Sequence, residues 1–436
     1  MSFKHLITYF VLFIGVLFIS CESTETASED MASNLKPLAF DPKQLKADLA
    51  NWAQEYELVG ASVVLFAKGE AIVQEYLGHA RVEDSVETTA SSTYRIASIS
   101  KTLSTLAVLK LVEAGKVDLE QDINTYLDWE LINPAFPSEK ITLAHILGHR
   151  SGIRDGKGYS NFLAEMRRGG IDIRELFTKN GKHFTQDMFA AYKPDEYFSY
   201  SNASWGIVAA VVEKVSGQRF DRFCKEQLFE PMGMQASFNI LDIPIEQVAT
   251  LYRANKGSWN PQADDVLNNA PTERAPANYI LGSNGLVYGP QGSLRASTSD
   301  MIQVAKLLMG NGEVDGTQIF KPETLALLSE DKWVYDGNNG DTWSDFWMSY
   351  GKGLQFIVNT DSADIIFSDR TMMGHPGIAY GLLSDMYVDP ETQSGVIFIT
   401  NGSKQAFGYG PTTSFYGVEE ALFKILYPIL LVTEAQ

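Results

Sequence analysis

The sequence predicts an α+β protein in which strands from both chain ends form one antiparallel sheet, flanked by helices, with an inserted mostly helical subdomain over about residues 115–285. Residues 61–66 and 71–76 are β-rich runs separated by a short turn, which indicates a hairpin near the N-terminus. Residues 382–388 and 395–400 repeat this pattern near the C-terminus. Because the segment between the two hairpins is mostly helical in pattern, we expect it to be inserted between the two halves of the sheet.

Three helices are expected beside this sheet. Residues 98–114 are apolar on nearly all sides, which is typical of a helix buried between layers, and Gly115 is a suitable end. A second apolar helix covers residues 202–215, starting at 202 or 203, and ends before Gly217. Residues 415–430 predict a C-terminal helix with a broad apolar face.

The composition describes a folded globular protein. The chain has 436 residues, of which 45% are hydrophobic and 20% charged. Its net charge is −19, which makes it unsuited to bind nucleic acid through phosphates. The only cysteines, Cys21 and Cys224, exclude a disulfide framework and a zinc site built mainly from thiolates, and we expect Cys224 to be a buried thiol. No repeat or second linker divides residues 39–436, so we expect one large domain there.

The first residues predict an export signal. Residues 1–20 combine the positive Lys4 with an apolar run that is shorter than the roughly 20 residues of a membrane span. The segment ending at Cys21 resembles a bacterial lipobox, in which a lipidated cysteine follows the cleavage site, although Phe18 stands where leucine is usual. We therefore expect a lipoprotein signal peptide, a lipidated Cys21 and a flexible acidic tether over residues 21–38.

This interpretation makes the protein an exported, membrane-anchored bacterial lipoprotein that faces the periplasm or the cell surface. One alternative is an ordinary signal peptide that happens to contain a cysteine. Another is an uncleaved anchor. No sequence feature predicts an oligomeric state.

Some common catalytic motifs are absent from the chain. There is no G-x-S-x-G elbow, no Walker-type G-x-x-x-x-G-K-[ST] segment and no G-x-G-x-x-G after a strand. His145 and His149 are four residues apart, which predicts that they share one helix face, but Ile146 stands where a zinc peptidase has glutamate. We therefore interpret both as structural histidines rather than metal ligands.

Ser98 and Lys101 form an S-x-x-K motif at the start of the buried helix. A serine hydroxyl becomes a strong nucleophile when a base takes its proton, and lysine can be that base when burial or cationic neighbours lower its pKa. Three residues apart at a helix start, the two side chains face the same side, and the free N–H groups of the helix end suit a developing oxyanion. Ser329 and Lys332 repeat the spacing in a charged stretch, which we interpret as solvated surface.

Tyr200-Ser201-Asn202 is a second element with suitable chemistry. A tyrosine oxygen near the lysine can pass a proton to the leaving group, and an asparagine amide can hold a substrate carbonyl and orient the lysine. Tyr159-Ser160-Asn161 repeats the pattern in a loop, but the Tyr200 copy precedes an apolar helix and is favoured. The structural alternative for either copy is a helix N-cap.

His375-Pro376-Gly377 is the third element and precedes the C-terminal hairpin, so we expect it on or beside a strand at the sheet edge. A cation or hydrogen-bond donor at His375 could steer the proton relay, and Gly377 would let a substrate approach the backbone closely. The alternative is a plain turn.

In this order, the three elements resemble those of the serine β-lactamase and penicillin-binding protein superfamily, most closely its branch of class C β-lactamases, D-alanyl-D-alanine carboxypeptidases and related esterases. Residues 141–153, 231–234 and 292–297 also resemble family segments, and the resemblance covers about residues 45–435. It implies the β-lactamase/transpeptidase-like fold and acyl transfer to serine followed by hydrolysis, with no metal or organic cofactor. The implied partner is a small-molecule or peptide substrate.

The resemblance implies a role for each matched residue. Ser98 would be the acylated nucleophile, Lys101 the base that activates it, and Tyr200 a member of the proton relay. Asn202 would contact a substrate amide. The oxyanion hole would consist of the N–H groups of Ser98 and Ile378.

One departure from the family pattern concerns the third element. His375 occupies the place where many members have the lysine of K-T-G, but Pro376 replaces the hydroxyl residue that helps to bind a substrate carboxylate. Arg295 and Arg370 are candidates to replace the lost hydrogen bond.

The sequence leaves three functions open. The first is a β-lactamase-related, D-Ala-D-Ala carboxypeptidase-like peptidase, the second a carboxylesterase on the same scaffold, and the third a non-catalytic penicillin-binding-like module. The intact set of Ser98, Lys101, Tyr200 and Asn202 favours an enzyme. Residues 331–353 contain six aromatic residues, which either line a substrate cleft or cover the sheet.

Overall fold

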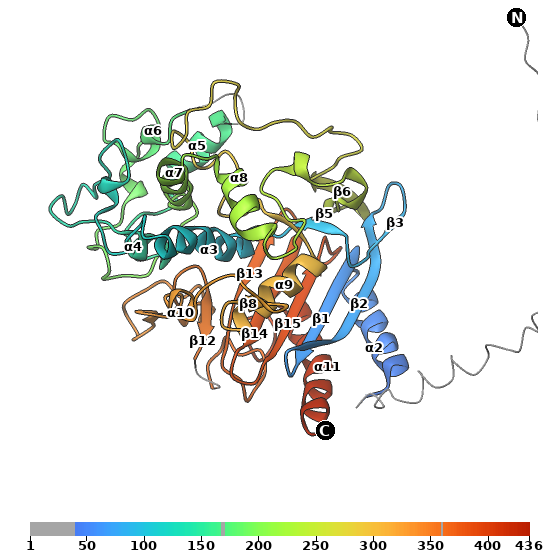
Figure 1. Cartoon of the computed structure of the whole chain (residues 1–436). Coiled ribbons are helices and arrows are strands. Elements are labelled where there is room, and N and C mark those ends of the chain that lie inside the picture. Colours follow the sequence, from blue (N-terminus) through green and yellow to red (C-terminus); the bar gives the residue numbers. More distant parts are fainter. Residues whose placement is uncertain (1–39, 167–170, 359–360) are drawn as a thin grey trace, which may run out of the picture. The chain divides into compact units, whose positions relative to one another are not determined.

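An antiparallel sheet joins the two ends of the part of the chain that the structure describes (Figure 1). This computed structural model describes residues 40–166, 171–358 and 361–436, and the predicted signal peptide, Cys21 and the tether lie outside the described residues. The sheet has nine strands in the order β10-β11-β12-β13-β14-β15-β1-β2-β3. Its strands are β1 (Gly60–Ala67), β2 (Glu70–Arg81), β3 (Val86–Glu87), β10 (Trp333–Val334), β11 (Ser349–Tyr350), β12 (Gln355–Ile357), β13 (Met372–Ala379), β14 (Leu382–Asp389) and β15 (Ser394–Thr400).

Pairing between β1 and β15 joins the N-terminal and C-terminal strands into one sheet. Val63 lies opposite Phe398, and both hairpins predicted from the sequence are present, as β1–β2 and as β14–β15. Because successive side chains of a strand point to opposite faces, β1 contributes to two cores. Val63 packs with one face and Val64 with the other. This arrangement confirms the predicted α+β fold class with strands from both chain ends.

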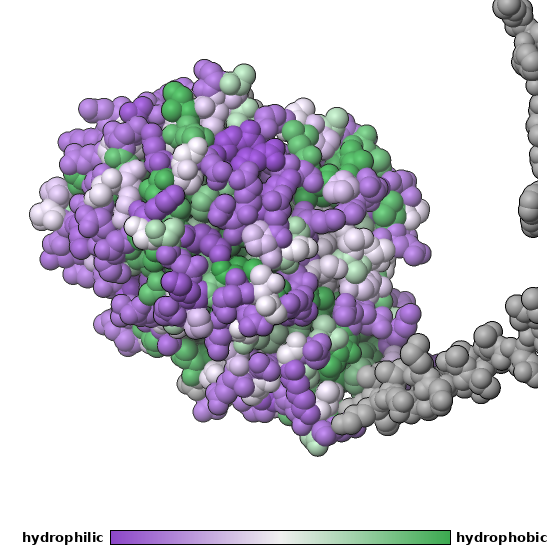
Figure 2. Space-filling view, viewed as in Figure 1, coloured by the Kyte–Doolittle hydropathy of each residue, from purple (hydrophilic) through white to green (hydrophobic). Residues whose placement is uncertain are grey.

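Helices cover both faces of the sheet. The terminal helices α2 (Pro42–Glu55) and α11 (Gly417–Glu434) pack against each other and against the face that contains Val63. The helix α9 (Thr298–Met309) packs on β14 and β15 from the other face (Figure 1). Figure 2 shows that hydrophilic residues cover most of the visible surface, with apolar patches scattered between them.

The predicted buried helices are α3 (Ser100–Glu113) and α7 (Trp205–Ser216), which pack against each other. Gly217 ends α7 in the left-handed conformation, with φ at 72°. Both helices begin later than the sequence suggests. Residues 97–99 form a 3₁₀ turn before α3, and Asn202 lies outside α7 because its backbone N–H donates to Asp155.

The inserted segment combines short helices, turns and irregular chain. Its helices besides α7 are α4 (Leu143–Leu147), α5 (Lys157–Met166), α6 (Arg174–Phe177) and α8 (Phe220–Cys224). It also contains a hairpin that the sequence did not reveal, β5 (Leu251–Asn255) with β6 (Ser258–Ala263). The remaining strands and α-helix of the described residues are β4 (Thr93–Arg95), β7 (Arg295–Ser297), β8 (Glu313–Val314), β9 (Thr317–Gln318) and α10 (Pro322–Ala326). Within the described ranges, no helix is both long and apolar enough to span a membrane.

Candidate active site

Ser98 lies in the 3₁₀ turn that precedes α3. The preceding residue, Ala97, has a φ of 50°, which is a strained conformation for a residue with a side chain. Ser100 holds this turn, since its hydroxyl donates to the Ala97 carbonyl at 2.6 Å and accepts from the Leu294 N–H at 3.0 Å. The turn is thus fixed from within and from the loop before β7, and it leaves Ser98 partly exposed.

Strand β13 packs directly against the turn that carries Ser98. A Cβ added at Gly377 would lie 2.5 Å from the Ile96 carbonyl oxygen and 3.3 Å from the Ala97 Cβ. The sequence suggested that this glycine opens the backbone to a substrate. The space at the Cβ position of Gly377 is filled by the chain itself, so the glycine allows the strand to approach the turn that carries Ser98, and its contact with a substrate stays a prediction.

Lys101 is buried beneath Ser98. Its Nζ donates to Ser98 Oγ at 3.2 Å, to Asn202 Oδ1 at 2.8 Å and to the Gln291 carbonyl at 2.9 Å. Burial lowers its pKa from 10.5 to about 7, and the charge of Asp155 acts in the opposite direction. The neutral amine is therefore well populated near pH 7, as the role of a base requires.

Asp155 orients Asn202. Its carboxylate accepts from the backbone N–H groups of Asn202 and Ala203 at 2.8 Å each and from the Asn202 side-chain amide at 2.8 Å. Because the amide nitrogen of Asn202 is held there, its oxygen faces Lys101. Asp155 could not be recognised from the sequence, because it lies 46 residues before Ser201 in a loop with no motif of its own.

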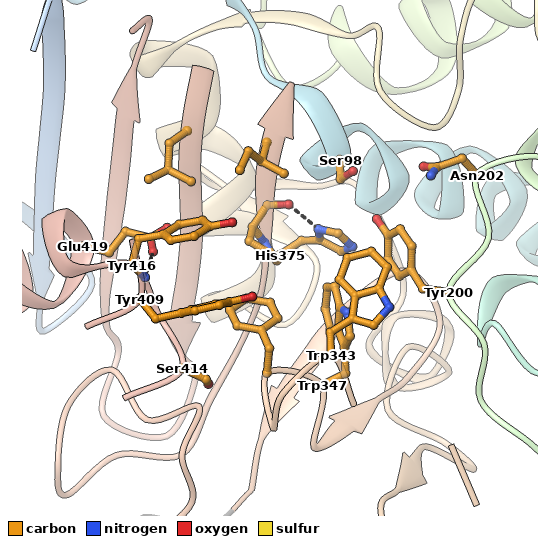
Figure 3. Close-up of a pocket in the computed structure, with 14 residues that line it drawn as sticks. Ser98, Tyr200, Asn202, Trp343, Trp347, His375, Tyr409, Ser414, Tyr416 and Glu419 are labelled. Carbon is orange, nitrogen blue, oxygen red and sulfur yellow. Dashed lines mark hydrogen bonds between the residues drawn. The ribbon is translucent and has the colours of Figure 1, made fainter. Parts of the chain in front are cut away.

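Tyr200 stands over the lysine. Lys101 Nζ lies 4.8 Å from the centroid of the Tyr200 ring, and the ring stacks on Trp347 with centroids 5.1 Å apart. In Figure 3 the Tyr200 hydroxyl points toward Ser98. Burial raises the pKa of Tyr200, and a hydrogen bond with Ser98 partly opposes this shift. Tyr200 is consequently protonated at neutral pH.

His375 is fully buried and neutral. Its Nδ1 lies 2.6 Å from the Pro376 carbonyl oxygen, which can only accept, so Nδ1 carries the proton. Its Nε2 therefore accepts from the Tyr350 hydroxyl at 3.0 Å. Burial and the charge of Lys101 lower the pKa of His375 to about 3. The sequence-based idea of a cation at this position is wrong, because both ring nitrogens are engaged and the imidazole stays uncharged.

One cavity of about 200 Å³ is bordered by Ser98, Tyr200, Asn202 and His375. Figure 3 shows Ser98, Asn202 and Tyr200 at one end and Tyr409, Tyr416 and Glu419 at the other, across the strand that carries His375. Ile378 projects into it and is 51% exposed. The complete lining is Ser98, Tyr200, Asn202, Trp343, Phe346, Trp347, His375, Pro376, Ile378, Leu383, Tyr409, Ser414, Tyr416 and Glu419.

The aromatic residues of segment 331–353 divide between the cavity and a buried cluster. Trp343, Phe346 and Trp347 line the cavity. Trp333 is instead buried in a small apolar cluster, stacked on Phe198 with ring centroids 4.3 Å apart.

Comparison with known proteins places this geometry in a family. The family model described as Beta-lactamase matches residues 35–413, which is most of the chain. The chain belongs to the beta-lactamase family. Among curated relatives, it is 22% identical to penicillin-binding protein 4 of Amycolatopsis lactamdurans, over 85% of this chain and 87% of that one. It is 28% identical to penicillin-binding protein 4* of Bacillus subtilis, over 78% and 67% of the two chains.

Solved structures agree with the beta-lactamase fold. The octameric penicillin-binding protein homologue from Pyrococcus abyssi superposes with a TM-score of 0.65, at 23% identity, over 90% of this chain and 78% of that one. The D-amino acid amidase from Ochrobactrum anthropi SV3 superposes with a TM-score of 0.60, at 19% identity, over 88% and 97%. These likenesses show the shared fold.

The second copies of the family motifs lie apart from Lys101. Ser329 donates to the Ala326 carbonyl, and Lys332 Nζ lies 5.8 Å from the Phe356 ring centroid, in a different cavity. Tyr159 belongs to α5 and receives a hydrogen bond from the Gln291 side chain at 3.3 Å. The structure therefore groups the first serine copy and the Tyr200 copy, as the sequence analysis favoured.

Neither arginine suggested as a carboxylate ligand in this beta-lactamase-type site reaches the cavity. Arg295 is buried and forms an ion pair with Asp264 at 2.7 Å. Arg370 is paired with Glu434 of α11. Both predictions are wrong, because each guanidinium is already held by a carboxylate away from Ser98.

His145 and His149 do not share a helix face. The helix α4 ends at Leu147, and His149 follows it with a φ of 55°. The buried His149 ring packs against Tyr200, with centroids 4.3 Å apart, and its Nδ1 accepts from the Ser201 N–H at 3.1 Å. It therefore helps to hold Tyr200 and Ser201 in place. Among the residues that the structure describes, no group of three or more His, Cys, Asp or Glu side chains is placed to hold a metal ion.

Proposed function

We propose that the protein is a serine hydrolase that cleaves an amide or ester bond through an acyl-enzyme on Ser98. The observation that carries this proposal is Lys101, whose Nζ lies 3.2 Å from Ser98 Oγ and whose pKa is lowered to about 7. A buried lysine with this pKa can accept the serine proton at neutral pH.

The acylation step follows from these positions. Lys101 takes the Ser98 proton while Oγ forms a bond to the substrate carbonyl carbon. The N–H groups of Ser98 and Ile378 are the proposed donors to the oxyanion. Tyr200, which is protonated, gives its proton to the departing amine or alcohol and regains one from Lys101. Water then attacks the ester, the same groups act in reverse, and the acid is released.

Within this reaction class, we propose a β-lactamase-related peptidase of the D-Ala-D-Ala carboxypeptidase kind. The penicillin-binding relatives and the amidase neighbour support this proposal. The alternative is a carboxylesterase, which Pro376 favours, since its missing hydroxyl removes a charged hydrogen bond worth ~1.5–3 kcal/mol to a substrate carboxylate. A non-catalytic binding module is the third possibility, and the connected Ser98–Lys101–Asn202 geometry argues against it.

Labelling of the full-length protein tests the nucleophile. The protein is incubated with a fluorescent fluorophosphonate and, separately, with a fluorescent penicillin, and peptide mass analysis locates any adduct. Labelling of Ser98 by both reagents supports a penicillin-recognising enzyme, and labelling by the fluorophosphonate alone supports the esterase. Ser98→Ala should lose all labelling and turnover while remaining folded, and the matched control Ser329→Ala should retain both. Folded wild-type protein that reacts with neither reagent would indicate the binding module.

We also propose that the mature protein is exported and held on a bacterial membrane by a lipid on Cys21. The signal-like residues 1–20 and the lipobox-like segment before Cys21 support this proposal. A lipid-anchored enzyme would meet small molecules or peptides outside the cytoplasm.

A further inference from the structure

A cavity lined by two arginines adjoins the candidate active site. Arg95 and Arg274 line it, and the other polar or charged lining residues include Glu273, Gln291, Ser293 and Tyr380. This cavity shares no lining residue with the one that contains Ser98. The arginines stand out in a chain whose net charge is −19.

Arg95 is held in place by neutral groups. Its Nε donates to the Gly292 carbonyl at 3.0 Å and its Nη2 to the Ser293 hydroxyl at 2.8 Å. Its guanidinium carbon lies 4.8 Å from the centroid of the Tyr380 ring. Among the described residues, no carboxylate forms an ion pair with Arg95, although the charge of Asp264 and a hydrogen bond with the Tyr380 side chain act on its guanidinium.

Arg274 also has no partner for its charge. It is exposed, and its guanidinium forms no ion pair or hydrogen bond with any side chain in the described ranges. Two carboxylates lie near Arg274. Asp264 binds Arg295 through both oxygens, and Glu273, which lines the cavity, accepts from the Tyr288 hydroxyl at 2.8 Å and pairs with Arg219 at 3.4 Å. The cavity is therefore lined by two arginines and by one carboxylate that already has a cationic partner.

Two short connections link this cavity to the reacting groups. The carbonyl of Gln291 accepts from Lys101 Nζ at 2.9 Å, while Gln291 also lines the arginine cavity. Tyr380 follows Ile378 by two residues, and Ile378 lines the Ser98 cavity. The arginine cavity therefore lies beside residues of the Ser98 site.

We propose that Arg95 and Arg274 form an anion subsite, which binds a carboxylate on a part of the substrate remote from the scissile bond. This inference rests on the proposed serine hydrolase function and adds a substrate class, namely acids, peptides or esters with a negative charge away from the reacting carbonyl. Guanidinium groups bind carboxylates through paired, charge-assisted hydrogen bonds. The subsite also provides local attraction for an anion that the net negative chain otherwise repels.

Matched esters test the subsite with full-length protein. A series of p-nitrophenyl esters of dicarboxylic acids from adipate to suberate carries one free carboxylate, and the comparison series has this carboxylate capped as a primary amide. Spontaneous hydrolysis is subtracted. We expect Arg274→Gln to raise KM for the charged esters by roughly 10-fold, with kcat and the capped esters unchanged. The KM of the wild type for the charged esters should rise with salt, and that of the variant should be nearly constant.

Control variants separate the subsite from a structural effect. Arg253→Gln removes another exposed arginine that lines a different cavity, and it should leave both series unchanged. Arg95→Lys keeps a positive charge beside the turn that carries Ser98 but removes the paired N–H donors of the guanidinium group. It should raise KM for the charged esters only. An equal change for charged and capped esters in Arg274→Gln would overturn the proposal.

A binding measurement keeps the subsite testable apart from catalysis. Calorimetry of adipate with Ser98→Ala protein does not depend on turnover, and the affinity should fall roughly 10-fold when Arg274→Gln is added. Equal affinity in the two proteins would overturn the subsite even if every ester is hydrolysed. Loss of turnover of the capped esters in Ser98→Ala, together with their retention in Arg274→Gln, would show that the proposed function stands independently.

Discussion

The charge around Lys101 sets the pH range in which this residue can act as a base. Its pKa of about 7 results from burial, with the Asp155 charge opposing the shift. The rate of acylation should therefore rise with pH through about 7, as Lys101 loses its proton. At the residue scale, Asp155 has two opposing effects, because it keeps Asn202 in place and also favours the charged lysine.

Asp155→Asn should separate these two effects. Removing the negative charge lowers the pKa of Lys101 further, so the rising limb of the kcat/KM profile should move to lower pH. The weaker hold on Asn202 should reduce kcat by roughly 10-fold, a typical effect of misplacing a proton-transfer group. The pH dependence of ester hydrolysis measures both quantities. An unshifted limb would show that the Asp155 charge does not reach Lys101.

Gly377→Ala should damage the site through packing alone. The added Cβ would lie 2.5 Å from the Ile96 carbonyl oxygen, so β13 or the turn that carries Ser98 must move. We expect a loss of about 1–3 kcal/mol in the free energy of unfolding and a decrease in fluorophosphonate labelling at Ser98. Gly408→Ala is the matched control, because no atom lies within 4 Å of its added Cβ. Wild-type labelling and stability in Gly377→Ala would contradict this account.

At the scale of elements, the local patterns predicted the sheet and its main helices. The runs that became β1, β2, β14 and β15 and the apolar helices α3 and α7 are readable because their patterns are regular. The contacts that orient Lys101 come from residues far apart in the chain, such as Asp155 and the Gln291 carbonyl. Backbone carbonyls and loop carboxylates leave no periodic signal, so this part of the site could not be predicted.

The docking of α11 on the sheet involves two buried acids. Asp385 of β14 and Glu419 of α11 are both buried and interact with each other. Burial raises the pKa of Asp385 from 3.8 to about 7, and burial and Asp385 raise that of Glu419. Because the folded state binds the Asp385 proton more tightly than the unfolded chain does, this proton stabilises the fold fully below pH 3.8. Its contribution is lost as the pH rises through about 7.

Asp385→Asn should therefore stabilise the protein at high pH. The amide cannot ionise. The free energy of unfolding of the variant minus that of the wild type should therefore be about 2 kcal/mol larger at pH 8 than at pH 4. Urea denaturation at both pH values measures this difference. Glu246→Gln removes an exposed acid and should show no such pH dependence. A constant difference between Asp385→Asn and the wild type would contradict the pKa shift.

At the scale of the whole molecule, the proposed anchor makes a separate prediction. Cys21→Ser should remove the lipid and move the protein from the membrane fraction to the soluble fraction of a bacterial host. Fractionation with immunodetection measures the distribution, and mass analysis of the N-terminal peptide detects the lipid. Cys224→Ser alters the buried thiol and should leave the membrane fraction unchanged. Equal fractionation of Cys21→Ser and the wild type would exclude the lipid anchor.

The pairing of β1 with β15 has a consequence for how the protein is made. The Thr400 hydroxyl donates to the Gly60 carbonyl across 340 residues of sequence, so the middle of the sheet cannot form until nearly all of the chain has left the ribosome. Ser98 and Lys101 are synthesised early, but β13, which packs against their turn, arrives late. A nascent or truncated chain thus carries Ser98 and Lys101 without the strand that completes their site, and we expect the proposed hydrolytic activity only in the finished protein.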